Sequence, residues 1–327
     1  MATSHPGMPR PAPLELSKLD LLEGLKKIDA DPDATTRVLG METQFRTRMQ
    51  AHVDALPLQT APFRKFATSP FVLMIYCLRR GYTKISEIEQ DILPAKLFSS
   101  METSAGRMTE EVMLPLYNWQ VVPSGMQTAN SVLDGLQTGD TVLRLATLKS
   151  GPRCLNDSIS ENIADSIVTH APAWASKHGV QSIDFSFGAL YGTPRQSNKK
   201  DWHILRNIVN KLDPDSVTVK PDERWHCAFR LGDVEVTVTI RIGLDWWQYL
   251  GGKSCLLEMC VALVRACVAP GTADPESHKY MIADLFDIVS LEGIPDGFNA
   301  SILQHSQWPW LFFLSRHFCD KLSLGAP

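Results

Sequence analysis

Two acidic residues and one lysine are spaced along the chain in a way that could support chemistry on a phosphate. Lys149 ends an apolar run, residues 140–148, that is typical of a buried strand. Asp134 comes earlier, at the end of another short extended run, and Glu161 follows in a predicted helix. Because lysine is rarely buried without a partner, we expect Lys149 to project into a cleft that also receives the two carboxylates.

This set of side chains suits the hydrolysis of phosphodiester bonds. Carboxylate oxygens bind a hard divalent cation such as magnesium and leave water in its coordination shell. The cation activates a water nucleophile and neutralises charge on the phosphate. An ammonium group positions that water or stabilises the charge that develops on phosphorus. We therefore predict that Asp134 and Glu161 hold Mg2+ and that Lys149 acts on the attacking water.

An α/β core is predicted to position these residues. Between residues 131 and 268 the apolar patterns give the order β, β, α, β, α, β, β, α, which implies a mixed sheet flanked by helices. The predicted segments are strands at 131–134, 140–149 and 181–192, a hairpin at 225–243, helices at 157–176, 201–212 and 253–268, and a polar-aromatic loop at 244–252.

The N-terminal part of the chain has a different pattern. Residues 1–15 predict a disordered tail, residues 16–100 a helical region, and residues 101–327 a catalytic domain that carries the candidate site. Apolar spacing predicts helices over 14–55, over 69–81 as a buried helix, and over 84–92 and 104–117.

Composition excludes several classes of protein. The chain has 327 residues with a formal net charge of -4 and seven cysteines without a CxxC pair. Neither a run of 18 apolar residues nor a secretory signal is found, so we expect a cytoplasmic protein with reduced cysteines and no membrane span. The phosphate-binding motifs GxxxxGK[ST] and GxGxxG and the zinc motif HExxH are also absent from the sequence.

Asp134-Gly135 and Thr147-Leu148-Lys149 resemble the signature of the PD-(D/E)XK nuclease superfamily. The chain departs from that signature, which usually has an acid at the position of Thr147 and a proline at that of Leu133. In the CCGG branch of type II restriction endonucleases, Ser or Thr takes the first position and the carboxylate comes from the next helix. The resemblance implies that Glu161 supplies it and that the Leu148 carbonyl joins the metal ligands.

Two further segments, KSGPRCLND and GLDWWQYLGG, are similar to segments of restriction enzymes that cut interrupted GG/CC palindromes. The resemblance covers roughly residues 104–268. It implies a restriction-endonuclease-like core, a double-stranded DNA substrate with a GC-containing palindrome, and a homodimer. Similar nucleases often carry a metal-proximal glutamate on an earlier helix, and Glu110 is preferred over Glu111 for that position.

Several polar residues around the lysine are predicted to contact DNA. Arg153 has the planar fork that reads the O6 and N7 atoms of guanine, and the loop at 191–200 is basic. The predicted contacts are Arg153, Asn156, Asp157, Arg195, Ser197, Asn198, Lys199 and Lys200. Asp157 is also the rival second metal ligand, and Asn156 or Asp157 is the predicted helix cap.

Simpler interpretations remain open for each residue. Lys149 could be an exposed lysine at a strand end, Asp134 a turn residue, and Glu161 a solvated acid in a first helical turn. Arg153 could flank its helix without touching a base. The alternative functions are a repair or resolvase-like nuclease with the same core, and a binding or assembly protein that retains the fold without catalysis.

Overall fold

The computed structural model describes residues 11–56, 61–62, 69–123, 132–213, 216–220, 225–271, 282, 285–291 and 293–325. Residues 1–10 of the predicted tail and Ser131 of the first predicted strand lie outside the described residues. Close to the N-terminus, β1 (Glu15–Ser17) pairs in parallel with β9 (Lys321–Ser323), so segments from the two ends of the chain meet.

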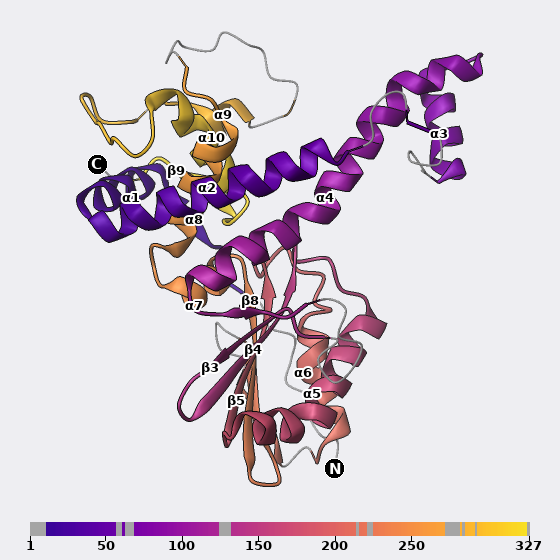
Figure 1. The fold of residues 1–327 in the computed structure, drawn as a ribbon, viewed down its shortest axis with the longest axis vertical. Coiled ribbons are helices and arrows are strands. Elements are labelled where there is room, and N and C mark those ends of the chain that lie inside the picture. Colours follow the sequence, from indigo (N-terminus) through magenta and orange to yellow (C-terminus); the bar gives the residue numbers. More distant parts are fainter. Residues whose placement is uncertain are drawn as a thin grey trace.

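The described residues form a mixed sheet of seven strands in the order β2-β3-β4-β5-β8-β7-β6 (Figure 1). Its strands are β2 (Gln120–Val121), β3 (Gly135–Thr138), β4 (Val142–Lys149), β5 (Ser182–Ala189), β6 (Thr218–Lys220), β7 (His226–Leu231) and β8 (Val234–Ile242). The neighbours β4, β5 and β8 are parallel, and the flanking pairs are antiparallel. The predicted α/β class with a mixed central sheet is confirmed.

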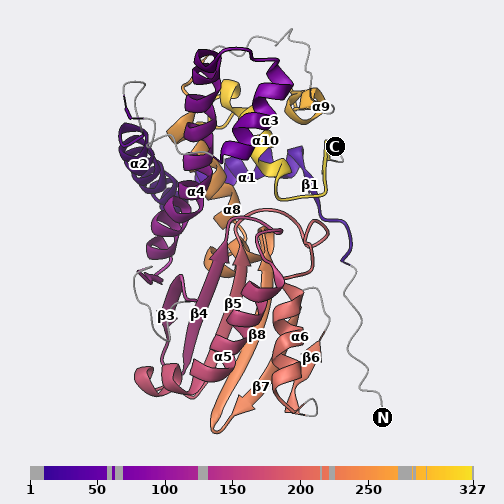
Figure 2. The same ribbon diagram turned by 90° about the vertical axis from the view of Figure 1, so that its right-hand side faces the viewer.

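The helices α5 (Asp157–His178) and α6 (Trp202–Lys211) lie across one face of the sheet (Figure 2), and a second core packs on the other face. Because side chains alternate along a strand, Leu143 and Leu145 of β4 pack toward α5 and α6. Ala146 and Leu148 of the same strand belong to a second core on the opposite face. Each face of β4 is therefore packed, which fixes its register and the position of its last residue.

The second core joins the sheet to a bundle of helices. It contains α1 (Lys18–Ala30), α2 (Pro32–Asp54), α7 (Leu244–Gly251), α8 (Cys255–Cys267) and α10 (Trp308–Arg316), with the shorter α9 (Leu285–Val289) and η4 (His305–Gln307) nearby. Trp246 of α7 packs so closely on β5 that a Cβ at Gly188 would lie 2.9 Å from its ring. The prediction of a polar-aromatic loop at 244–252 is therefore wrong. Residues 244–251 form α7, because the two tryptophans of this segment are buried together.

A helical arm projects from this body (Figure 1). It consists of α3 (Pro70–Arg80), η2 (Ile85–Ile88) and the first half of α4 (Glu89–Leu116), whose second half returns to the sheet. The predicted helix at 69–81 forms, but the prediction that it is buried is wrong, since Leu78 is 85% exposed. The helices expected at 84–92 and 104–117 merge into η2 and α4, so the expected boundary at residue 100 falls inside one helix.

Candidate functional site

Three residues from separate elements come together beside the end of β4. Asp134 immediately precedes β3, whose Gly135 pairs with Ala146 of β4. The amide of Asp134 donates to the Ala146 carbonyl at 2.9 Å, and its Oδ2 accepts from the Leu148 amide at 2.6 Å. These two hydrogen bonds hold the carboxylate next to the last two residues of β4.

Glu110 reaches the same place from α4. Burial is the main reason that the pKa of Glu110 is raised to about 8; the charge of Asp134 acts in the same direction and that of Lys149 opposes it. Burial also raises the pKa of Asp134, against the Leu148 hydrogen bond and the charge of Lys149. The structure therefore brings together the predicted Glu110, Asp134 and Lys149. Glu111 instead pairs with Arg48 and Arg107.

This group has donors that fit a hard divalent cation. Two partly buried carboxyls with raised pKa values ionise more readily when a cation lies between them. The main chain of Leu148 lies next to Asp134, and the contact between them is made by the Leu148 amide. No group of three or more His, Cys, Asp or Glu side chains suited to a metal occurs in the described part of the chain. Two carboxylates completed by main-chain oxygen and water would suit magnesium.

Lys149 lies at the edge of the sheet where the parallel strands end. The carboxyl ends of β4, β5 and β8 meet at one edge of the sheet, where ligands of open α/β sheets commonly bind. The Leu190 amide donates to the Lys149 carbonyl at 2.8 Å, which extends the ladder beyond both strands. No ion pair or hydrogen bond joins the Lys149 ammonium to another described residue. Its charge is available to a ligand at the two carboxylates.

Glu161 does not join this group. Its side chain is 61% exposed on α5, and its carboxylate lies 3.9 Å from Lys211, which also pairs with Asp165 at 2.5 Å. The side chain therefore faces α6 and solvent. The expectation that Glu161 reaches back to replace an acid at position 147 is not met by this placement.

The turn after Lys149 is packed under an aromatic ring. A Cβ at Gly151 would lie 2.6 Å from the ring of Tyr191, so only glycine lets the ring lie on this turn. Tyr191 is itself 46% exposed. The exposed Arg153 donates through Nε to the Gln196 carbonyl at 3.0 Å. Its terminal nitrogens have no hydrogen-bond partner among the described residues.

Two of the predicted DNA contacts, Asn156 and Asp157, lie at the start of α5 and have different partners. Asn156 caps the helix, because its side chain accepts from the Ile159 amide at 2.9 Å. Asp157 is an exposed partner of Lys200 at 2.7 Å and of His203 at 2.9 Å. These bonds lower the pKa of Asp157, with the Lys200 hydrogen bond as the largest cause. Asp157 therefore lies with α6 and not with Asp134.

Most of the predicted contacts in the 191–200 loop are engaged within the protein. Ser197 donates to buried Asp201 at 2.7 Å, and Asn198 donates to the Leu155 carbonyl at 3.0 Å. Lys199 donates to the Pro194 carbonyl at 2.6 Å and lies over a tryptophan ring. These bonds give the loop a fixed shape. Sequence reasoning missed Asp201, whose one signal was its position at the start of a predicted helix.

Arg195 differs from its neighbours in the loop. It is exposed, and it has no ion pair or hydrogen bond with any residue that the structure describes. Arg195 and the terminal nitrogens of Arg153 therefore leave guanidinium donors open on the segments that follow Lys149.

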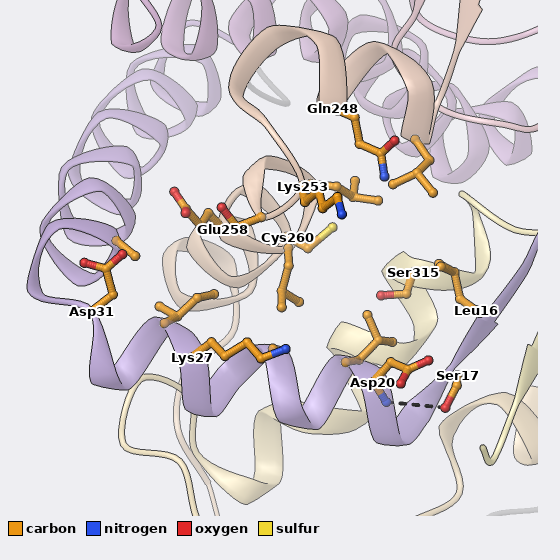
Figure 3. Close-up of a pocket in the computed structure, with 18 residues that line it drawn as sticks. Leu16, Ser17, Asp20, Lys27, Asp31, Gln248, Lys253, Glu258, Cys260 and Ser315 are labelled. Carbon is orange, nitrogen blue, oxygen red and sulfur yellow. Dashed lines mark hydrogen bonds between the residues drawn. The ribbon is translucent and has the colours of Figure 1, made fainter. Parts of the chain in front are cut away.

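A separate cavity of about 360 Å³ lies in the helical bundle (Figure 3). It is lined mainly by apolar side chains of α1, α7 and α8, with polar groups such as Lys27, Lys253 and Gln248 around it. It includes none of the predicted site residues, so the group around Lys149 lies outside this cavity.

No family model matches the sequence, and no curated protein matches it. No helix in the described segments is both long and apolar enough to cross a membrane.

Proposed function

We propose that this protein is a magnesium-dependent type II restriction endonuclease that cuts double-stranded DNA at a short palindrome, with GC pairs in the site. The observation that supports this most directly is the meeting of Glu110, Asp134 and Lys149 at one edge of the sheet. Two partly buried carboxyls beside an unpaired lysine are the groups that this hydrolysis requires.

The fold also supports a PD-(D/E)XK-like core. The elements α4, β2, β3, β4, α5 and β5 follow one another in the chain, and the three residues come from α4, the start of β3 and the end of β4. Strand pairing holds Asp134 beside β4, and the packing of both faces of β4 fixes Lys149. A core of this kind would place the acids and the lysine against one phosphate.

In this proposal Glu110 and Asp134 hold Mg2+, with main-chain oxygen near Leu148 as a further ligand. The bound cation would supply the positive charge that activates water and offsets charge on the phosphate. Lys149 orients the attacking water or donates to a phosphate oxygen. Arg153 and Arg195 face the DNA, and Arg153 reads a guanine edge with its free terminal nitrogens.

The other predicted DNA contacts have structural or electrostatic roles in this proposal. Asn156, Ser197, Asn198 and Lys199 shape the helix start and the loop that carry the two arginines. Lys200 is held by Asp157 and contributes charge near the phosphate backbone. The substrate and the seven free thiols both fit a cytoplasmic location.

The test is cleavage of long duplex DNA with and without Mg2+. We expect defined fragments with Mg2+, none with EDTA, and a loss of at least about 1,000-fold in rate for Lys149→Ala. Lys177→Ala is the matched control, because this exposed lysine lies in the last turn of α5 at the opposite edge of the sheet.

Two results would redirect the proposal. Cleavage restricted to branched or damaged DNA would identify a repair or resolvase-like nuclease. No cleavage by the wild type, or equal cleavage by Lys149→Ala, would refute the catalytic assignment and favour a non-catalytic binding protein.

A further inference from the structure

The arm of residues 69–102 carries an apolar face that the described residues leave largely uncovered. On α3, residues Phe71, Met74, Ile75 and Leu78 recur with the spacing of one helical face. Such a face normally packs on a core. Here no described side chain of α3 is buried, and Phe71 and Leu78 are 79% and 85% exposed.

The arm exposes many large apolar side chains to water. The exposed apolar side chains of the arm are Phe71, Val72, Met74, Ile75, Leu78, Ile85, Phe98 and Met101. The largest apolar patch of a typical monomer is about 300–600 Å². A phenylalanine alone can bury at least about 150 Å². Eight exposed apolar side chains on α3, η2 and α4 therefore offer apolar area of the order that an interface of roughly 800 Å² per partner needs.

The helix itself also indicates a partner. Isolated helices shorter than about 12 residues are marginal in water, and α3 has 11 residues. Most helical stability in proteins comes from packing an apolar face. Since that face is exposed in the part of the chain that the structure describes, a surface from another molecule would supply the missing packing.

The charge of the arm favours a second copy over DNA or an anionic membrane. Residues 69–102 contain four basic residues, Arg79, Arg80, Lys84 and Lys96, and four acidic residues, Glu87, Glu89, Asp91 and Glu102. A neutral arm neither repels its own copy nor attracts phosphate groups. The arm extends away from the sheet and the bundle in Figure 1, so two arms can meet without contact between the bodies.

We propose that the arm is the surface through which two copies of this chain form a two-fold symmetric dimer. The apolar face of α3, with Phe98 and Met101 of α4, packs against the same face of the second copy. This inference deepens the proposed function, on which it rests in one respect: a two-fold dimer presents two active sites to the two strands of a palindrome. The interface forms without DNA.

The test is the mass in solution, measured by sedimentation velocity from about 1 to 100 μM protein, without DNA and without Mg2+. We expect a dimer for the wild type and a monomer for Leu78→Glu, with the dissociation constant raised by about 100-fold or more. Leu39→Glu is the matched control, because this α2 leucine is 42% exposed outside the arm. Leu78→Met should retain the dimer.

The opposite results are equally clear. A wild type that stays monomeric at 100 μM, or a Leu78→Glu variant that dimerises like Leu39→Glu, would overturn the interface. So would a monomer that floats with phosphatidylglycerol vesicles, which would identify a membrane surface. Circular dichroism and the melting temperature report whether Leu78→Glu is folded, and Ile75→Lys is the second variant if it is not.

The dimer proposal and the endonuclease proposal can be refuted independently of each other. Lys149→Ala should sediment as a dimer while it cuts no DNA, because Lys149 lies beside the sheet and outside the arm. A dimer that cuts no DNA would overturn the nuclease alone, and a monomer that cuts both strands at a palindrome would overturn the dimer alone.

Discussion

Replacement of Glu110 by Gln tests whether two carboxyls are held together beside Lys149. Burial raises the pKa of Glu110 from its ordinary 4.5 to about 8 in the folded protein. The folded state therefore binds this proton more tightly than the unfolded state does. The free energy of unfolding must then fall as the pH rises from about 4.5 to 8. Glutamine has nearly the same shape and no charge, so Glu110→Gln removes this part of the pH dependence.

The size of the effect follows from the same two pKa values. At about 1.4 kcal/mol per pH unit, ionisation of Glu110 costs the folded state at most about 5 kcal/mol. The side chain is not completely buried, so water screens part of this cost, and we expect about 1–3 kcal/mol. Glu110→Gln should match the wild type at pH 4 and exceed its stability by that amount at pH 9.

Urea unfolding followed by tryptophan fluorescence in EDTA, at several pH values from 4 to 9, measures the difference. Glu111→Gln is the control: Glu111 is the next residue and forms surface ion pairs with Arg48 and Arg107, so its loss should cost less than about 1 kcal/mol. Addition of Mg2+ at pH 8 should stabilise the wild type and have less effect on Glu110→Gln. Parallel curves for wild type and Glu110→Gln across this range would falsify the placement of Glu110.

Four further substitutions test other parts of the structure. Arg153→Ala should reduce cleavage of the preferred site by about 10–100-fold and relax sequence preference, measured on a library of sites. Glu161→Gln should leave the cleavage rate within about two-fold, since its carboxylate faces α6. Glu258→Gln should lower the urea-unfolding free energy by about 3 kcal/mol, because Glu258 is 1% exposed and forms a bidentate pair with an arginine. Gly243→Ala should lower it by more than about 2 kcal/mol, because φ is +55° and a Cβ would meet a carbonyl oxygen.

The sheet could be predicted from the sequence because its strands are either strongly alternating or apolar throughout. The hairpin predicted around residues 231–233 forms as β7 and β8, and the helix predicted at 157–176 forms as α5. Pro172 does not end that helix, which continues to His178. The first strand was placed too early: β3 begins after Asp134, because pairing with β4 and not local apolar content sets its start.

Burial could not be predicted in the same way. The segment at 69–81 has the composition of a core helix, yet most of its described apolar side chains are exposed, because the described chain covers little of this helix. The reverse holds for residues 244–251, where Trp246 and Trp247 are completely buried in a helix that sequence reasoning placed in a loop. Apolar periodicity indicates a face, and tertiary contacts decide whether that face is covered.

Of the predicted site residues, Glu110, Asp134 and Lys149 lie together, and Glu161 lies apart from them. Thr147 occupies the position at which the resemblance expects an acid. Thr147 is buried, and its hydroxyl donates to the Val132 carbonyl just before Asp134. A carboxylate at this position would face that carbonyl oxygen with no proton to donate, so it would weaken the link that holds the Asp134 segment to β4. Threonine therefore positions Asp134, and a second carboxylate has to come from another element. Glu161 is directed away from the group, whereas Glu110 has a pKa raised by burial and by Asp134. We infer that α4, and not the helix after Lys149, compensates for the missing acid.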